Sequence, residues 1–218
     1  MNTDLFTSAN MTLNAGPDWS AETRHIEKYA GHVAGVDEVG RGPLAGPVIA
    51  AAVILDPDNI PVGLNDSKKL TKTKRETLYD LINQSALAVG IGEASVDEID
   101  QINILQASLL AMMRAVKNLD VQPASLLIDG NQPPATDLPF ECLVKGDTRS
   151  LSIAAASIIA KVERDRMMGD LAKIHPEFGW EKNAGYGVPA HMKGLNLVGP
   201  SRFHRKSFAP IRKLLDEE

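Results

Sequence analysis

The sequence predicts an α/β protein in which helices cover both faces of a mixed β-sheet. Three patterns predict it: short apolar runs follow a polar N-terminal stretch, helical segments then alternate with further strands, and one late helical segment is apolar on nearly all sides. With 218 residues, 44% of them hydrophobic and 23% charged, the chain suffices for one sizeable core and a small appended lobe. This composition excludes a chain that is mainly disordered.

The first 28 residues have neither the basic nor the apolar part of a targeting signal. We therefore expect a flexible N-terminal tail over residues 1–28, followed by a single domain over residues 29–218. Within that domain, His32 to Val36 and Pro47 to Leu55 are short apolar runs separated by glycines and prolines. They predict two strands with a turn-rich connection.

Capping signals and periodicity define the remaining elements. Thr73 and Glu76 have the spacing of a capping box, and so do Ser95 and Glu98. The expected elements, in order, are a helix at about Lys72 to Ser85, a strand at Ala88 to Ala94, a helix from Ser95 to near Leu119, strands at Ser125 to Ile128 and Phe140 to Val144, a long helix at Ser152 to His175, a glycine-rich loop at Gly179 to Pro189, a helix at about Ala190 to Leu197 and a basic C-terminal segment.

Four carboxylates follow predicted strands. Asp37 and Glu38 come directly after the first strand, Asp129 after the fourth and Asp147 just beyond the fifth, so they can meet at one edge of the sheet. Because side chains alternate along a strand, Asp37 and Glu38 can face one site only if the strand ends or bulges there. Converging carboxylates suit Mg²⁺ or Mn²⁺, and two such ions about 4 Å apart stabilise the attacking and leaving oxygens of a phosphodiester displacement. The pattern predicts metal-assisted hydrolysis.

A single acidic residue after a strand is more often a turn former or a helix cap. The second Asp-Glu pair, Asp97 and Glu98, illustrates this, because it falls in the first turn of a predicted helix, where a carboxylate suits the helix dipole. We assign no chemistry to that pair.

The spacing of Gly40, Gly42 and Gly46 is similar to a dinucleotide-binding fingerprint, which would suit a nicotinamide-dependent oxidoreductase. That fingerprint needs a helix after the glycines, and here Pro47 opens an apolar strand. The alternative is therefore weak, although the glycines still leave backbone exposed beside Asp37 and Glu38.

No apolar stretch reaches the roughly 18 residues that a membrane span requires. The single cysteine, Cys142, cannot form an internal disulfide, which favours a reducing compartment, and we expect a cytoplasmic protein. Cys142 lies in a predicted strand without a partner that would make it a nucleophile, so we assign it to the core.

Seven blocks of the sequence together resemble the bacterial ribonuclease HII family. They follow the family's order over about residues 30–215 and are Val36-Asp37-Glu38-Val39-Gly40-Arg41-Gly42-Pro43-Leu44-Ala45-Gly46-Pro47, Asn65-Asp66-Ser67-Lys68-Lys69-Leu70, Ile128-Asp129-Gly130-Asn131, Lys145-Gly146-Asp147, Ile153-Ala154-Ala155-Ala156-Ser157-Ile158-Ile159-Ala160-Lys161, Gly185-Tyr186-Gly187 and His204-Arg205-Lys206-Ser207-Phe208.

The resemblance implies an RNase H-like fold, a five-stranded mixed sheet flanked by helices with a small helical C-terminal part. It implies cleavage of RNA in RNA/DNA hybrids and incision 5′ to single ribonucleotides in duplex DNA, giving 3′-hydroxyl and 5′-phosphate ends, as in ribonucleotide removal during replication and repair. The family's metal ligands match Asp37, Glu38, Asp129 and Asp147, which would hold one Mn²⁺ or Mg²⁺ ion without substrate and two with it. We expect a monomer, and a contact with a processivity factor stays open.

An enzyme that acts at one ribonucleotide must sense a single 2′-hydroxyl group. The resemblance implies that the backbone of Gly40-Arg41-Gly42 contacts this group, while Tyr186 packs on the ribose and hydrogen-bonds to the same hydroxyl. Family members often carry a lysine where this chain has Ala184, so one phosphate contact is in doubt. The candidates for phosphate contacts are Lys68, Lys69, His204, Arg205 and Lys206.

Two further alternatives share parts of this pattern. A catalytically silent module would bind RNA/DNA hybrids and gain nothing from metal. A type HIII ribonuclease H has the same fold but carries an extra N-terminal domain, which we do not expect here.

The formal net charge of −5 argues, as an average, against a polyanionic partner. The cations are segregated, however. Gly187 to Leu215 contains six Lys or Arg and no acidic residue, and Lys68 to Arg75 contains five cations without an acid. Since metal would neutralise the four carboxylates, the basic segments are free to face a duplex.

Overall fold

The structure is a computed structural model that describes residues 16–216. Its five-stranded sheet has the order β3-β2-β1-β4-β5. Strands β1 and β2 pair antiparallel, as do β2 and β3, whereas β4 runs parallel to β1 and β5 parallel to β4. The five-stranded mixed sheet is therefore confirmed, with strands at Val33–Val39 (β1), Val48–Ile54 (β2), Ala88–Ala94 (β3), Ser125–Asp129 (β4) and Phe140–Leu143 (β5).

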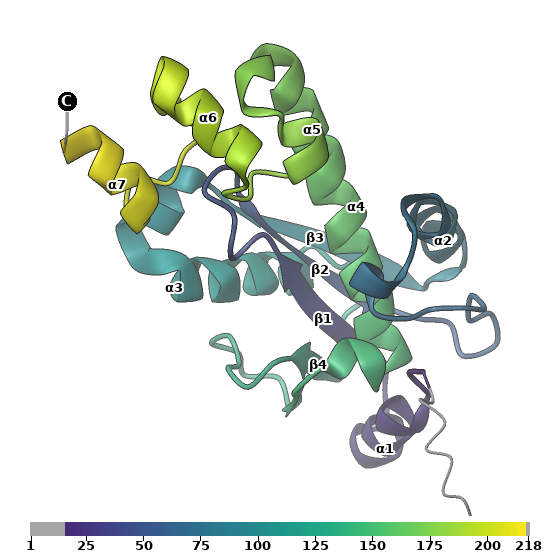
Figure 1. The fold of residues 1–218 in the computed structure, drawn as a ribbon. Coiled ribbons are helices and arrows are strands. Elements are labelled where there is room, and N and C mark those ends of the chain that lie inside the picture. Colours follow the sequence, from purple (N-terminus) through teal and green to yellow (C-terminus); the bar gives the residue numbers. More distant parts are fainter. Residues whose placement is uncertain (1–15, 217–218) are drawn as a thin grey trace, which may run out of the picture.

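Helices cover both faces of this sheet (Figure 1). Helix α3 (Val96–Lys117) packs on one face, and helices α4 (Leu151–Ile174) and α2 (Lys72–Ser85) pack on the other. Along β2, Ala50 and Ala52 belong to the α3-side core, while Ala51 and Val53 belong to the α4-side core. Because alternate residues enter opposite cores, β2 must be apolar throughout, and it reads as one continuous apolar run.

The start of α4 lies directly against β1. A Cβ atom added at Gly35 would stand 2.1 Å from the carbonyl carbon of Ser152, so only glycine allows this approach. The stretch from Ile153 to Ala160 is buried on all sides, as its composition predicts. The N-terminus of α4 is thus fixed beside the part of β1 that leads into Asp37.

The expectation of a flexible tail up to residue 28 is wrong for its last part. Residues 20–29 form helix α1 (Ser20–Tyr29), and the folded unit begins before residue 29. Residues 16–19 precede this helix, with Asp18 forming a β-bridge to Ser150, and residues 1–15 of that predicted tail lie outside the described residues.

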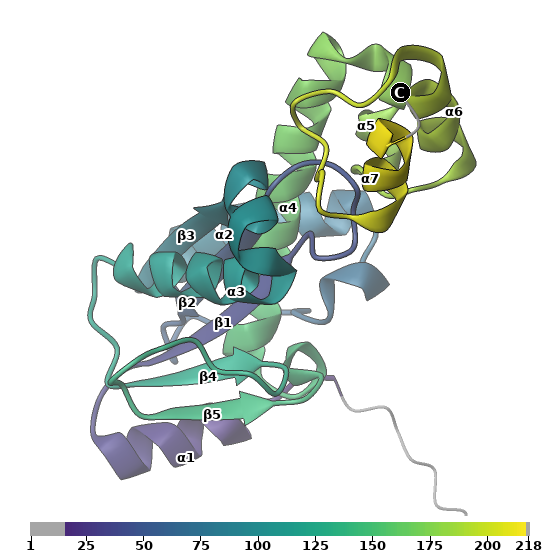
Figure 2. The same ribbon diagram turned by 90° about the vertical axis from the view of Figure 1, so that its left-hand side faces the viewer.

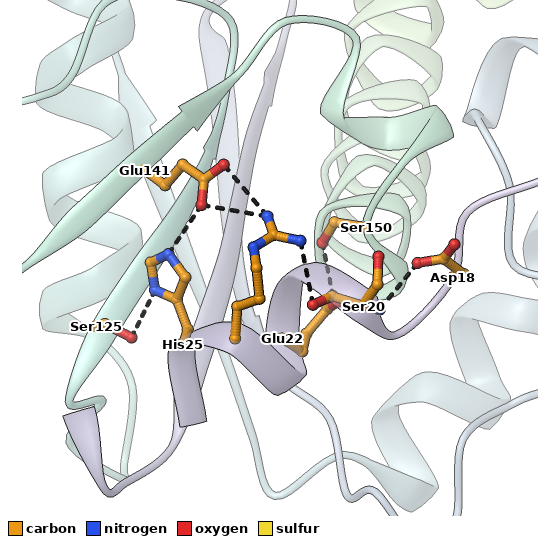
Figure 3. Close-up of polar contacts among 8 residues, drawn as sticks. Asp18, Ser20, Glu22, His25, Ser125, Glu141 and Ser150 are labelled. Carbon is orange, nitrogen blue, oxygen red and sulfur yellow. Dashed lines mark hydrogen bonds and ion pairs between the residues drawn. The ribbon is translucent and has the colours of Figure 1, made fainter. Parts of the chain in front are cut away.

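Helix α1 is held by polar contacts (Figure 3). The buried carboxylate of Glu22 accepts hydrogen bonds from the Ser150 hydroxyl, at 2.6 Å, and from the Ser152 N–H, at 2.8 Å, both at the start of α4. On the next turn of α1, His25 contacts Ser125 of β4 at 2.9 Å. The inner face of this helix is therefore partly polar, which explains why apolar periodicity does not reveal it.

The predicted capping boxes have different outcomes. The box formed by Ser95 and Glu98 is confirmed, with the two reciprocal hydrogen bonds in place. The box at Thr73 and Glu76 is wrong, because α2 is capped by Thr71, whose hydroxyl accepts the N–H of Lys74. Both helices begin close to where the sequence places them.

Helix α3 is interrupted at Asn103, whose backbone has φ 69° and ψ 165°. The side-chain oxygen of Asn103 accepts the N–H groups of Leu105 and Gln106 and so caps the second segment. The sequence predicts one unbroken helix here, because an internal asparagine gives no sign of whether its side chain caps or faces solvent.

The C-terminal lobe stands at the edge of the sheet where β1 ends (Figure 2). Its core contains Phe178, Trp180 and Ile211 together with Leu44 of the β1–β2 connection. The predicted loop over residues 179–189 is wrong at its start, where α5 forms. The elements of this lobe are the second half of α4, a 3-10 turn at Pro176–Phe178, α5 (Trp180–Asn183), α6 (Pro189–Val198) and α7 (Ala209–Asp216).

Two smaller expectations concern the core and the membrane. Cys142 in β5 is half-buried against the α3-side core, and burial raises the pKa of its thiol. Within residues 16–216, we find no helix long and apolar enough to cross a membrane.

Candidate active site

Three segments place carboxylates at one edge of the sheet. Asp37 lies in β1, Asp129 is the last residue of β4, and Asp147 lies in a 3-10 turn (Gly146–Thr148) just after β5. Asp37 is buried, and its burial together with the charges of Glu38, Asp129 and Asp147 raises its pKa well above the ordinary value. The four carboxylates predicted from the sequence therefore share one electrostatic environment.

Strand β1 continues through the first pair of carboxylates. Asp37 pairs with Ala51 and Glu38 with Ala50 in the regular antiparallel register, so the expectation that the strand ends or bulges there is wrong. Alternation directs Asp37 to the α4 side and Glu38 to the α3 side. The Asp129 carboxylate, on the neighbouring parallel strand, still raises the pKa of both. The site thus has carboxylates on both faces of the sheet at this edge.

Asp147 returns to this edge because the chain turns sharply after β5. Lys145 adopts the left-handed conformation, with φ 56°, and the next N–H, that of Gly146, donates to the Asp129 carboxylate at 2.7 Å. Gly146 packs so tightly that a Cβ atom there would lie 2.6 Å from Ile153 of α4. One hydrogen bond therefore fixes the turn of Asp147 relative to Asp129.

The unbalanced charge of this edge fits a bound cation. Glu38 Oε2 is buried and has no hydrogen-bond partner, and the pKa of Asp147 is raised to about 6 by burial and by nearby carboxylates. Carboxylate oxygens are the ligands that Mg²⁺ and Mn²⁺ prefer. In the described part of the chain, no three His, Cys, Asp or Glu side chains are grouped closely enough to hold a metal ion as they stand.

A fifth carboxylate, Asp66, lies beside Asp147 and contributes to the rise in its pKa. Asp66 caps a short 3-10 turn (Ser67–Lys69), and Ser67 donates its N–H to the Ser157 hydroxyl of α4 at 3.3 Å. Lys68 of the same turn acts on Asp147 in the opposite direction. Sequence reasoning missed Asp66, although it stands in one of the quoted blocks.

The Gly40–Gly42 loop follows β1 and faces outward. Gly40 is buried with φ 97°, a conformation that side chains disfavour, whereas Arg41 and Gly42 are exposed. The Arg41 guanidinium donates to Glu38 at 3.2 Å. A Cβ atom at Gly42 would lie 3.4 Å from the ring of Tyr186, which is 44% exposed. The structure therefore brings the predicted ribose-contacting residues together.

Two predicted phosphate contacts are wrong. His204 and Arg205 are completely buried, so neither can reach a phosphate. The His204 ring contacts His191 at 2.9 Å, and the Arg205 guanidinium donates to backbone carbonyls. Lys68, Lys69 and Lys206 are exposed. A run of basic residues is usually a solvated surface, and nothing in the run itself shows which members turn inward.

Two further interpretations can now be decided. The glycines lead into β2 rather than a helix, which removes the basis for a dinucleotide-binding loop. Ala184, where the resemblance implies a lysine, has a left-handed backbone with φ 48°, and its carbonyl accepts a hydrogen bond from Arg164. The contact that the structure shows at this position is therefore made by the backbone carbonyl.

A mixed sheet that collects carboxylates at one edge, beside exposed backbone and a tyrosine, defines a metal-dependent nuclease. Comparison with known proteins supports this class. The family model described as Ribonuclease HII matches residues 34–211. A ribonuclease HII from Paramagnetospirillum magneticum is 58% identical over 192 residues, which cover 86% of this chain and 95% of the relative. The chain therefore belongs to the ribonuclease HII family.

Solved structures agree with the fold. The crystal structure of ribonuclease H2 from Pyrococcus horikoshii OT3 superposes with a TM-score of 0.73 at 27% identity, covering 85% of this chain and 98% of that one. Bst-RNase HIII in complex with Mn²⁺ shares the fold, with a TM-score of 0.69 at 21% identity over 85% of this chain and 70% of that one. The RNase H-like fold is confirmed. The protein is a metal-dependent endoribonuclease that acts on RNA/DNA hybrids.

Proposed function

We propose that this ribonuclease incises duplex DNA on the 5′ side of a single embedded ribonucleotide and leaves 3′-hydroxyl and 5′-phosphate ends. The observation that carries the proposal is the juxtaposition of the Gly40–Gly42 loop and the Tyr186 ring beside the carboxylate edge. Such a site can contact one ribose next to one phosphodiester. The corresponding role is ribonucleotide removal during DNA replication and repair, by a monomer in the cytoplasm.

Recognition of the ribose rests on the exposed backbone of the loop. The N–H groups of Arg41 and Gly42 donate to no residue within 16–216, so they are available to the oxygen of a 2′-hydroxyl. The hydroxyl of Tyr186 can pair with the same group while its ring packs on the sugar. A deoxyribose leaves these donors unpaired, which disfavours it.

Cleavage rests on the acidic edge. Asp37, Glu38, Asp129 and Asp147 would hold Mn²⁺ or Mg²⁺, one ion alone and two with substrate. When bound, such ions polarise the phosphodiester and lower the pKa of water. Arg41 holds Glu38 on the α3 side, and the Asp129 carboxylate accepts the Gly146 N–H, so one hydrogen bond restrains each of these two carboxylates. Lys68, Lys69 and Lys206 are exposed for contacts with phosphates of the duplex.

The test uses a DNA duplex that contains one ribonucleotide, with Mn²⁺ or Mg²⁺ present. We expect a single cut 5′ to the ribonucleotide, and no cut in an all-DNA duplex. Asp129→Asn should abolish cleavage, while Asp97→Asn, at the start of α3, serves as the matched control. No cleavage by the wild-type protein, or undiminished cleavage by Asp129→Asn, would rule out the proposal.

Tyr186 is tested separately. Tyr186→Ala should lower the rate on the single-ribonucleotide duplex by about 10-fold to 100-fold, and Tyr186→Phe should isolate the hydroxyl from the ring. An unchanged rate for Tyr186→Ala removes this residue from the site. Binding of hybrids in EDTA without any metal-dependent cleavage would instead support a silent binding module.

A further inference from the structure

Arg164 of α4 and Arg205 of the segment between α6 and α7 are both completely buried. Among residues 16–216, no carboxylate lies within ion-pair distance of either guanidinium. Burial lowers the pKa of Arg164 to about 10 and that of Arg205 to about 9, so both remain charged at neutral pH. Burying an unpaired cation is costly unless hydrogen bonds replace its hydration.

Backbone carbonyls of the β1–β2 connection replace that hydration at Arg205. Its Nη2 donates to the carbonyl of Gly40 at 2.5 Å, and its Nη1 donates to the carbonyl of Arg41 at 3.0 Å. Both Nε and Nη2 donate to the Gly46 carbonyl, at 3.0 and 2.8 Å. One guanidinium thus holds both ends of the connection.

Arg164 joins the same connection to the segment that carries Tyr186. It donates to the carbonyls of Pro47 at 2.9 Å, Ala45 at 3.0 Å and Ala184 at 2.9 Å. A Cβ atom at Gly40 would lie 2.2 Å from Arg164 Nε, so this glycine makes room for the guanidinium. The two segments are therefore tied through one side chain.

Peptide geometry converts these inward contacts into an outward orientation. The carbonyl of Gly40 shares a planar peptide unit with the N–H of Arg41, and the carbonyl of Arg41 shares one with the N–H of Gly42. In a trans unit the two groups point in opposite directions. Because Arg205 holds both carbonyls inside the protein, the N–H groups of Arg41 and Gly42 must point away from it, toward the surface beside Tyr186.

We infer that Arg164 and Arg205 are positioning residues for ribose recognition, which fix the outward N–H groups of Arg41 and Gly42 and set their distance from Tyr186. This inference rests on the proposed function and extends it. A lysine cannot do the same, because its single ammonium lacks the planar fork that reaches several carbonyls at once. The carboxylates make no contact with either arginine, so metal binding does not depend on them.

The experiment compares Arg205→Lys and Arg164→Lys with matched controls on the same segments. Arg202→Lys and Arg166→Lys change exposed arginines that stack on Phe203 and pair with Glu76, respectively. We expect the buried variants to lose about 10-fold to 100-fold in kcat/KM on the single-ribonucleotide duplex, and the controls to stay within about twofold. Mn²⁺ affinity, measured by the shift in Tm, and affinity for an all-DNA duplex should be unchanged in all four.

If a Lys variant does not fold, a chemical-rescue experiment takes its place. Arg205→Ala, assayed with guanidinium chloride and with the same concentration of sodium chloride, should recover cleavage only in guanidinium. Wild-type rates in both Lys variants, loss of Mn²⁺ affinity in proportion to activity, or no rescue would overturn the inference. If the wild-type protein cleaves hybrids but not the single-ribonucleotide duplex, the proposed function fails. In that case, the cleavage rates of the Lys variants on the hybrid test the roles of Arg164 and Arg205 separately.

Discussion

Two Asp-Glu pairs of the chain, Asp37-Glu38 and Asp97-Glu98, have opposite surroundings in the structure. Glu98, at the start of α3, accepts the N–H of Ser95 at 2.9 Å and is held by Arg114 at 2.6 and 2.9 Å, so its pKa is lowered to about 2. Asp37 is buried among other carboxylates, and its pKa is raised. The anionic form of Glu98 is thus stabilised by its surroundings, whereas the anionic form of Asp37 is destabilised.

This difference separates a structural from a functional use of carboxylates. At a helix N-terminus, backbone N–H groups and a nearby arginine compensate the charge within the fold. At the sheet edge, the fold compensates the charge only in part, and Glu38 Oε2 is left without a partner. Repulsion that the protein itself does not relieve supports the proposal that a cation binds at this edge.

The largest expected effect is on cleavage. Asp37→Asn should lower the rate on an RNA/DNA hybrid by more than about 100-fold, because it removes a proposed metal ligand, whereas Asp97→Asn should leave it within about twofold. Steady-state rates with Mn²⁺ and with Mg²⁺ measure this. Equal losses in both variants would erase the contrast between the pairs.

Metal removal gives the next effect. Adding Mn²⁺ to the metal-free protein should stabilise it by about 2.7 kcal/mol at 100 times the dissociation constant. Thermal unfolding with EDTA and with Mn²⁺ reports this gain. It should disappear in Asp37→Asn and persist in Glu98→Gln, and a gain that survives in both would place the ion elsewhere.

A smaller effect concerns Asp147 in the metal-free protein. Its folded pKa is about 6 against an ordinary value of 3.8, so the folded state binds the proton more tightly, and stability is lost as the pH rises from 3.8 through 6. Asp147→Asn should therefore stabilise the protein above pH 6, by about 1 to 2 kcal/mol after allowance for solvent screening at this half-buried site, and have little effect below pH 3.8. Urea denaturation with EDTA at both pH values checks the sign, and the opposite pH dependence would contradict it.

The smallest effect belongs to the helix pair. The lowered pKa of Glu98 contributes stability above its ordinary value of 4.5, and this contribution is lost as the pH falls through about 2. Glu98→Gln should destabilise the protein by about 0.5 to 1 kcal/mol at neutral pH and leave cleavage unchanged. Denaturant midpoints measure this, and a loss of cleavage without loss of stability would refute the capping role.

Much of the fold could be predicted because it depends on local patterns. The capping box at Ser95 and the apolar run of β2 act within a few residues of chain. The features that sequence reasoning missed depend on contacts between distant segments. Asp66 reaches Asp147 because Ser67 bonds to Ser157, which follows 90 residues later. Helix α1 is held by buried polar groups, which resemble surface residues in a sequence.

The basic C-terminal segment illustrates the same limit at the site. Lys206 is exposed while the preceding Arg205 is completely buried, and neighbouring cations give no indication of this difference. The four carboxylates were easier to predict, because they lie at or near the ends of strands, and the sheet alone brings these ends to one edge.

The bond between Arg205 and the Gly40 carbonyl joins residues 165 positions apart. During synthesis, the ribosome therefore releases all four carboxylates well before the side chain that orders the Gly40–Gly42 loop. A chain that stopped short of residue 205 would contain all four carboxylates and Arg164, but it would lack the side chain that holds the Gly40 and Arg41 carbonyls. Under the proposed function, the loop that recognises the ribose is thus completed later in synthesis than the acidic edge.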